Sequence, residues 1–154
     1  MDMMMALRAH ARGGAEQLVY EDAPVPVAAP GEALVAVHAA AAAFAELTWD
    51  LSWTTRDGRD RTPVIPAHEM SGTVAGPGGA AAGVAPGDEV YGLIGFFEDQ
   101  ITPDPGELAQ LAGLVDTGRP GPVVSQVFPL TGGRRAFGSA GRARPPGKTV
   151  LTLR

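Results

Sequence analysis

Apolar and polar residues alternate in short runs along the first 95 residues, and glycine, proline and charged residues separate these runs. Such alternation, with many β-branched side chains, is typical of half-buried strands. The pattern therefore predicts strands over residues 4–10, 17–23, 33–40, 68–76 and 88–95. The five-alanine run at 39–43 continues the third of these strands, because its small side chains allow the chain to pass a crowded site.

A helical period replaces this pattern after Asp104. Asp104 is a favoured N-cap, Pro105 occupies the first helical position, and Glu107 lies three residues after the cap, as in a capping box. Apolar residues then recur on one face before Gly118 ends the helix: Leu108, Leu111, Leu114 and Val115. Beyond this helix we predict a strand over 122–130, a short helix over 131–141 and a closing strand over 147–154. The fold class is therefore mainly β with added helices, or α+β.

Composition narrows the possible roles of the chain. With 154 residues, 45% of them hydrophobic and 19% charged, it is large and apolar enough for one compact globular domain. Its net charge of −5 and the lack of a basic stripe argue against a nucleic-acid partner. No leader peptide, membrane-length apolar run or cysteine is visible in the sequence. We therefore expect a cytoplasmic protein with no membrane attachment, no disulfides and no thiolate chemistry.

The junction at residues 91–108, "YGLIGFFEDQITPDPGEL", is unusual. The strand 88–95 passes almost directly into the apolar stretch 96–102 and then into the capped helix. Two elements meet with hardly a turn between them, which suggests that a segment that normally separates them is absent.

Four segments carry a family resemblance: 21–41, 63–76, 84–93 and 128–151. In this order they resemble the quinone-oxidoreductase branch, which is zinc-independent and NADP-dependent, of the medium-chain dehydrogenase/reductase superfamily. The resemblance implies a GroES-like β-barrel catalytic domain, with a Rossmann nucleotide-binding domain almost wholly deleted at the 91–108 junction. Residues 1–95 would then be the first part of the barrel, 96–118 a remnant Rossmann strand and helix, and 119–154 the return to the barrel.

The glycine pattern gives an independent argument about the cofactor. A dinucleotide site needs a glycine-rich turn between a buried strand and a helix, so that backbone N–H groups reach the pyrophosphate. The only glycine-rich candidate is 76–83, and it leads into "VAPGDEV" instead of a helix. We therefore expect no nicotinamide binding and no other cofactor.

The residues present also argue against metal binding. Zinc-dependent relatives place a cysteine ligand at the position of Ala43 and the histidine of a "GHE" motif at the position of His68. Without cysteine this zinc set is incomplete. His68, Glu69 and Glu46 can in principle form a site, but the resemblance favours the non-zinc variant of the motif, whose side chains hydrogen-bond near the cleft. We predict no metal.

The remaining chemistry lies around the substrate cleft that the resemblance implies. Glu46 takes the place of the acidic residue in the family's "NPxD" stretch, while Ala43 and Phe44 replace its asparagine and proline. Glu46 and His68 are our candidate catalytic acid/base pair, and a structural hydrogen bond at the barrel mouth is the alternative. The candidate substrate-binding residues are Phe44, Trp49, Trp53, Glu69 and Tyr91.

The aromatic candidates each have a structural alternative. Trp49 and Trp53 lie four residues apart, so on a helical turn they share a face and can stack on a flat, apolar substrate. Alternatively, they cap the barrel core. Tyr91 faces the cleft if its strand keeps the family's register, and otherwise belongs to the core. His10 and His38 we interpret as structural.

Three functions follow from these residues. The first is a nicotinamide-independent enzyme that cyclises, isomerises or dehydrates an enone-, quinone- or polyketide-like small molecule. The second is a truncated NADP-dependent quinone oxidoreductase homologue with a relic activity or a borrowed cofactor. The third is a non-catalytic small-molecule binding or assembly module. We favour the first.

Assembly is the last expectation. In the related enzymes the final Rossmann strand lies near the edge where two subunits join their sheets. Here residues 96–102 have lost their neighbouring strands, and the helix that follows has an apolar face with no sheet to cover it. We therefore predict a homodimer built on residues 96–117.

Overall fold

The structure is a computed structural model that describes residues 1–43, 45–55, 57–78, 83–94, 104–119, 121–139 and 146–153. Within these residues the strands are β1 (Met3–Ala9), β2 (Leu18–Pro24), β3 (Glu32–Ala42), β4 (Glu69–Gly78), β5 (Glu89–Leu93), β6 (Val124–Pro129) and β7 (Lys148–Thr152). The α-helices of the same residues are α1 (Asp50–Trp53), α2 (Pro105–Asp116) and α3 (Gly133–Gly138), and the short 3-10 helices are η1 (Ala15–Gln17), η2 (Glu46–Thr48) and η3 (Leu130–Gly132). The predicted α+β class is confirmed, while Phe44 and the predicted strand 96–102 lie outside the described residues.

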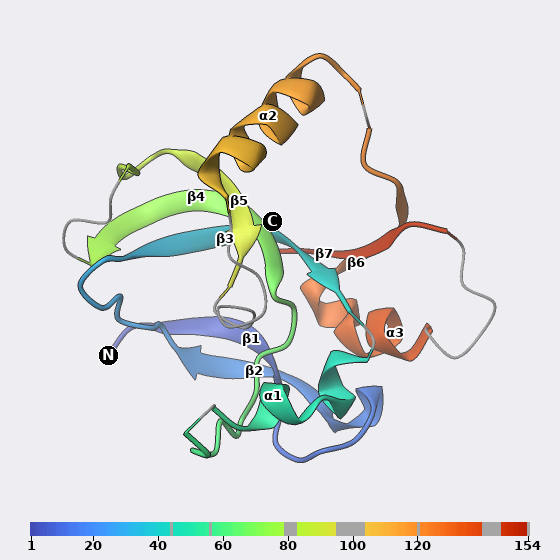
Figure 1. Cartoon of the computed structure of the whole chain (residues 1–154). Coiled ribbons are helices and arrows are strands. Elements are labelled where there is room, and N and C mark those ends of the chain that lie inside the picture. The colour runs from blue at the N-terminus through green and yellow to red at the C-terminus, as the bar shows by residue number, and fades with distance from the viewer. Residues whose placement is uncertain are drawn as a thin grey trace.

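Two sheets organise the strands (Figure 1). The hairpin of β1 and β2 forms a two-stranded antiparallel sheet. The other sheet has the order β5-β4-β3-β7-β6, in which only the β6–β7 pair is parallel. β3 is central, with β4 on one side and β7 on the other, and its alanines fit between them: Ala39 pairs with Ser71 and with Thr152. This explains why small residues suit the run at 39–43.

The two sheets are tied together at the end of β1. Ala9 and Val64 exchange two backbone hydrogen bonds of 2.8 and 2.9 Å, which link β1 to the segment that leads into β4. The core lies between the sheets and α3, and its buried members include Leu7, Leu18, Leu47, Trp53, Phe137 and Leu151. α3 begins at Gly133, where a Cβ would lie 2.3 Å from a methyl group of Leu7. Glycine at this position therefore allows α3 to pack directly on β1.

α2 has the ends that its sequence predicted. The Asp104 carboxylate accepts the N–H groups of Gly106 and Glu107 at 2.7 and 3.0 Å. At the other end Gly118 has φ +74°, its N–H donates to Val115 O, and the N–H of Arg119 donates to Leu114 O. This is the Schellman arrangement, which needs a left-handed residue such as glycine.

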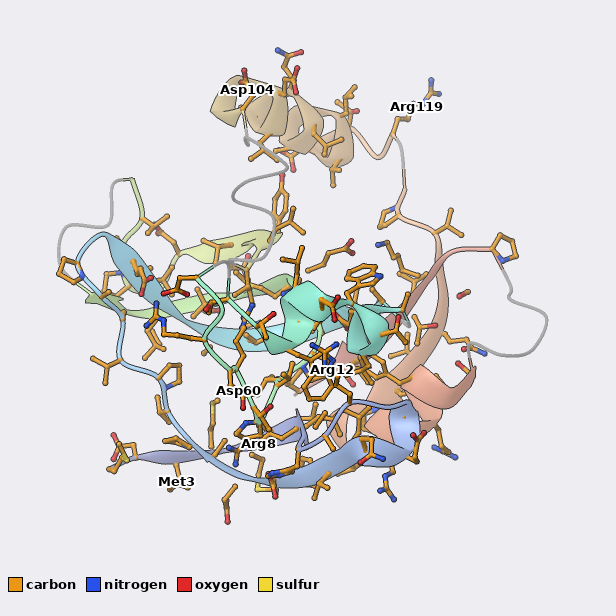
Figure 2. The ribbon with its side chains drawn as sticks, turned by 60° about the horizontal axis from the view of Figure 1, so that its bottom comes forward. Met3, Arg8, Arg12, Asp60, Asp104 and Arg119 are labelled. Atoms are coloured by element: carbon orange, nitrogen blue, oxygen red, sulfur yellow. The ribbon has the colours of Figure 1, made fainter. Side chains whose placement is uncertain are left out.

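α2 stands apart from the sheets at the top of Figure 2, with Asp104 and Arg119 near its two ends, while Arg8 and Asp60 lie in the lower half of that view. Its apolar residues remain between 45 and 52% exposed: Leu108, Leu111, Leu114 and Val115. Nothing in the described part of one chain therefore covers this face. Within that same part of the chain, no helix is long and apolar enough to cross a membrane.

Candidate active site

The end of β3 positions the first candidate residue. The chain leaves β3 at Ala42 and turns into η2, where the N–H of Glu46 donates to Ala43 O at 3.0 Å. Two side chains from α1 hold this turn by hydrogen bonds: Ser52 Oγ donates to Glu46 O, and Trp53 Nε1 donates to Leu47 O at 2.9 Å. Glu46 is only 1% exposed, so these bonds hold a carboxyl group inside the protein.

The structure brings Glu46 and His68 together. Oε2 of Glu46 and Nε2 of His68 lie 3.4 Å apart, and both side chains are buried. Nδ1 of His68 lies 3.3 Å from the carbonyl oxygen of Ile94. Because a carbonyl oxygen only accepts hydrogen bonds, we assign the ring proton to Nδ1, and the lone pair of Nε2 then faces Glu46.

Burial controls the protonation of the pair. Loss of solvent is the largest influence on Glu46 and raises its pKa from the ordinary 4.5 to about 7, against the opposing effect of the N–H groups of Ala67 and Ala43. Burial also lowers the pKa of His68, and the positive charge of Arg61 acts in the same direction. Around neutral pH Glu46 is therefore divided between its protonated and ionised forms, beside an imidazole that burial favours in its neutral form.

Ala67 completes the support of Glu46. Its N–H donates to Oε1 of Glu46 at 2.9 Å, and its backbone has φ +79°, the left-handed region that alanine seldom adopts. Ala67 immediately precedes His68, so its backbone geometry decides where the imidazole points. Such strained residues cluster at functional sites, where neighbouring bonds hold them in place.

Glu69 lies apart from the buried pair. It is the first residue of β4, and its Oε1 accepts a hydrogen bond from Nζ of Lys148 at 2.6 Å. Both side chains are about half exposed. Lys148 begins β7 on the other side of β3, so this ion pair spans the central strand. Lys148 is also the only lysine in the sequence.

The other predicted contacts are dispersed. Trp53 is 3% exposed and belongs to the core, with Arg12 5.9 Å above its ring, whereas Trp49 precedes α1 and is 37% exposed. The two indoles therefore do not present one stacking face.

Tyr91 on the edge strand β5 is 57% exposed and pairs with Ser71, two residues along β4 from Glu69. Paired and alternate residues share a face of a sheet, so Tyr91 lies on the face of Glu69. Phe44 lies outside the described residues.

The arrangement includes residues that sequence reasoning missed. Ala67, Ser52 and Lys148 each hold a candidate residue by a hydrogen bond, and Ile94 supplies a carbonyl group. Only Lys148 carried a sequence signal, as the single lysine at the start of a predicted strand. Among the described residues, no three histidine, aspartate or glutamate side chains converge as a metal site requires.

A family comparison covers the part of the chain that carries this pair. The family model of the alcohol dehydrogenase GroES-like domain matches residues 29–113, more than half of the 154 residues, and the match includes Glu46, His68 and most of α2. The chain therefore belongs to this family. The predicted membership of the medium-chain dehydrogenase/reductase superfamily is confirmed.

Solved structures share the fold. The human synaptic vesicle membrane protein VAT-1 homolog-like protein is 13% identical with a TM-score of 0.80, and 99% of each chain is covered. A probable oxidoreductase from Mycobacterium abscessus is 16% identical with a TM-score of 0.73, covering 98% of this chain and 99% of the other. The quinone oxidoreductase from Coxiella burnetii is 18% identical with a TM-score of 0.55, covering 82% of this chain and 49% of that one. At these identities the likeness is one of fold.

Proposed function

We propose that this chain is a nicotinamide-independent enzyme that uses Glu46 and His68 to move protons on a small enone-, quinone- or polyketide-like molecule. Cyclisation, isomerisation and dehydration are the reactions that such proton transfer performs. The observation that carries the proposal is the buried pair itself, with Oε2 and Nε2 3.4 Å apart and the pKa of Glu46 raised to about 7. A carboxyl group with a pKa near the working pH can both give and take a proton.

The chemistry balances without a redox partner. In an isomerisation, Nδ1–H of His68 donates its proton to one carbon of the conjugated system while Nε2 takes the proton of Glu46. Nδ1 then removes a proton from another carbon of the same system, and Nε2 returns its proton to Glu46. One C–H bond forms, another breaks and the double bond moves, and both residues end in their starting forms. The molecule gains and loses no electrons, so this reaction needs no hydride donor.

Substrate access depends on His68. Its contact with Ile94 O is long at 3.3 Å and therefore weak, while Glu46 is held by Ala67 and enclosed. A substrate that displaces the His68–Ile94 contact would reach the imidazole first, with Glu46 behind it. Among the other candidates, Glu69 and Tyr91 lie on one sheet face, and Trp49 is partly exposed, so these three are the proposed substrate contacts. Trp53 we reassign to the support of η2.

Independence from nicotinamide is supported by the loop between β4 and β5. This connection leaves β4 at Gly78 and enters β5 at Glu89, two strands that pair antiparallel. A pyrophosphate-binding turn connects a strand to a helix, whose N-terminal N–H groups hold the phosphates. We therefore propose that 1–95 and 119–154 form one catalytic barrel domain, with 96–118 as the remnant of a nucleotide-binding unit.

A test of the proposed function is proton exchange in D2O. Simple enones and quinones are incubated with the protein in D2O without nicotinamide. Deuterium should then appear at carbons next to the carbonyl group, and NMR measures the rate at which it does so. Glu46→Gln and His68→Ala should each lower the exchange rate by roughly a hundredfold. His38→Ala is the matched control, since His38 contacts Thr73 and not this pair. Equal rates in all four proteins would contradict the assignment.

We also propose a homodimer through residues 96–117. The uncovered apolar face of α2 supports this, because a second copy of α2 offers a face of the same shape and composition. A two-fold pairing would bury both faces at once.

A further inference from the structure

Two pairs of side chains lie at the end of β3: the buried pair of Glu46 and His68, and the exposed pair of Glu69 and Lys148. Ala41 pairs with Glu69 on β4, and Ala42 pairs with Thr149 on β7. The next turn of the chain carries Glu46, and the residue before Glu69 is His68. The buried pair and the exposed ion pair of Glu69 and Lys148 are therefore built on the same end of the same three strands.

The titratable and charged groups near Glu46 come from β4, from β7 and from the segment that leads into β4. His68 faces it from the segment before β4, and Glu69, at the start of β4, disfavours its ionised form. Lys148, from β7, binds Glu69 at 2.6 Å, and Arg61 acts on His68. A negative charge beside a buried carboxyl group keeps it protonated, and a cation bound to that charge offsets the effect.

We propose that Lys148 is a positioning residue of the candidate active site: by binding the Glu69 carboxylate across β3, it offsets the negative charge beside the Glu46–His68 pair and so lowers the pH at which Glu46 ionises. This role of Lys148 deepens the proposed function. Only its effect on catalysis rests on that function, whereas its effect on the ionisation of Glu46 does not. The ionisation itself can be measured without a substrate.

A purely structural ion pair would behave differently. Half-exposed pairs contribute little to stability, so loss of Lys148 should leave the fold intact. If the pair only joined β4 to β7, the ionisation of Glu46 would not depend on it. Titration of Glu46 therefore separates the two roles.

The experiment follows the carbonyl stretch of protonated Glu46 by infrared spectroscopy from pH 5 to 9, with the band assigned by its loss in Glu46→Gln. In Lys148→Met the midpoint should move to higher pH by roughly half a unit, because the Glu69 charge is no longer offset and solvent weakens the effect. In Glu69→Gln it should move to lower pH. Lys148→Arg, which keeps the cation, should titrate like the parent chain.

Two further variants make the outcome decisive. Arg119→Met also removes one cation, but at the end of α2, and should leave the midpoint unchanged (Figure 2). Lys148→Met combined with Glu69→Gln should titrate like Glu69→Gln alone, because Lys148 acts through Glu69. The proposal is overturned if Lys148→Met behaves like Arg119→Met, or if its shift persists in the double variant. If the midpoints shift as expected but the protein exchanges no protons on enones, the proposed function is refuted and the role of Lys148 stands.

Discussion

The side chain of Glu46 holds the backbone of Ala67 in the left-handed region: Oε1 accepts the Ala67 N–H at 2.9 Å, and φ of Ala67 is +79°. A side chain with a Cβ pays a steric cost for this conformation, which glycine avoids. The bond therefore joins the buried acid to the residue that orients His68, and both members of the pair depend on it.

Ala67→Gly should increase the free energy of unfolding by up to about 1 kcal/mol, since it removes the steric cost at φ +79° and keeps the N–H donor. Chemical denaturation measures this. Ala45→Gly is the matched control, because Ala45 has φ −77° and ψ −14°, a conformation in which glycine is the less stable residue. Equal destabilisation by both substitutions would show that the Ala67 backbone is not strained.

The stability of the protein should depend on the protonation of Glu46. Burial raises the pKa of Glu46 in the folded chain from 4.5 to about 7, so between these pH values the folded chain keeps a proton that the unfolded chain has released. The free energy of unfolding contributed by this group is then fully present below pH 4.5 and is lost as the pH rises through 7, by at most about 3 kcal/mol.

Denaturation at several pH values, with Glu46→Gln as reference, measures this loss. The lowered pKa of His68 acts in the opposite direction below its ordinary 6.5, so the difference between the two proteins is the quantity to follow. A difference that stays constant from pH 4.5 to 8 would contradict the raised pKa.

Neither NADPH nor NADH should bind. At millimolar concentration neither should raise the melting temperature, because a ligand that binds the folded state alone must stabilise it. Isothermal calorimetry is the direct measurement, and a saturable heat of binding with either nucleotide would refute nicotinamide independence.

The homodimer should depend on the apolar face of α2. Leu111→Glu should shift the sedimentation of the protein to that of a monomer at micromolar concentration, because it places a charge at the centre of the proposed interface. Ala109→Glu adds the same charge on the opposite, exposed face of α2 and should leave the dimer intact. A parent chain that is already monomeric would refute the interface on residues 96–117.

Local sequence signals predicted the elements well. Asp104, Pro105 and Gly118 act through their own backbone neighbours, so α2 could be bounded from the sequence. The alternating runs likewise located the strands, because alternate residues of a strand lie on opposite faces of its sheet.

The site was only partly predictable. The meeting of Glu46 and His68 was expected from a resemblance, not from periodicity, and the φ of Ala67 leaves no trace in its residue type. The bond between Lys148 and Glu69 depends on β7 lying beside β3, a pairing between residues more than a hundred positions apart. Trp53 illustrates the limit of helical spacing, since a one-turn helix buried one tryptophan and left the other partly exposed.

The strand order has a consequence for how the protein is made. β7 is the last strand in the sequence, yet it lies between β3 and β6, and residues 149–152 pair with 39–42. During synthesis β3 is complete long before β7 has been made. The backbone groups on the β7 side of β3 are therefore unpaired while most of the chain emerges. Closing so distant a pair is slow, and an open strand edge invites other chains to bind. We therefore expect the nascent protein to be most prone to aggregation just before residues 148–152 leave the ribosome.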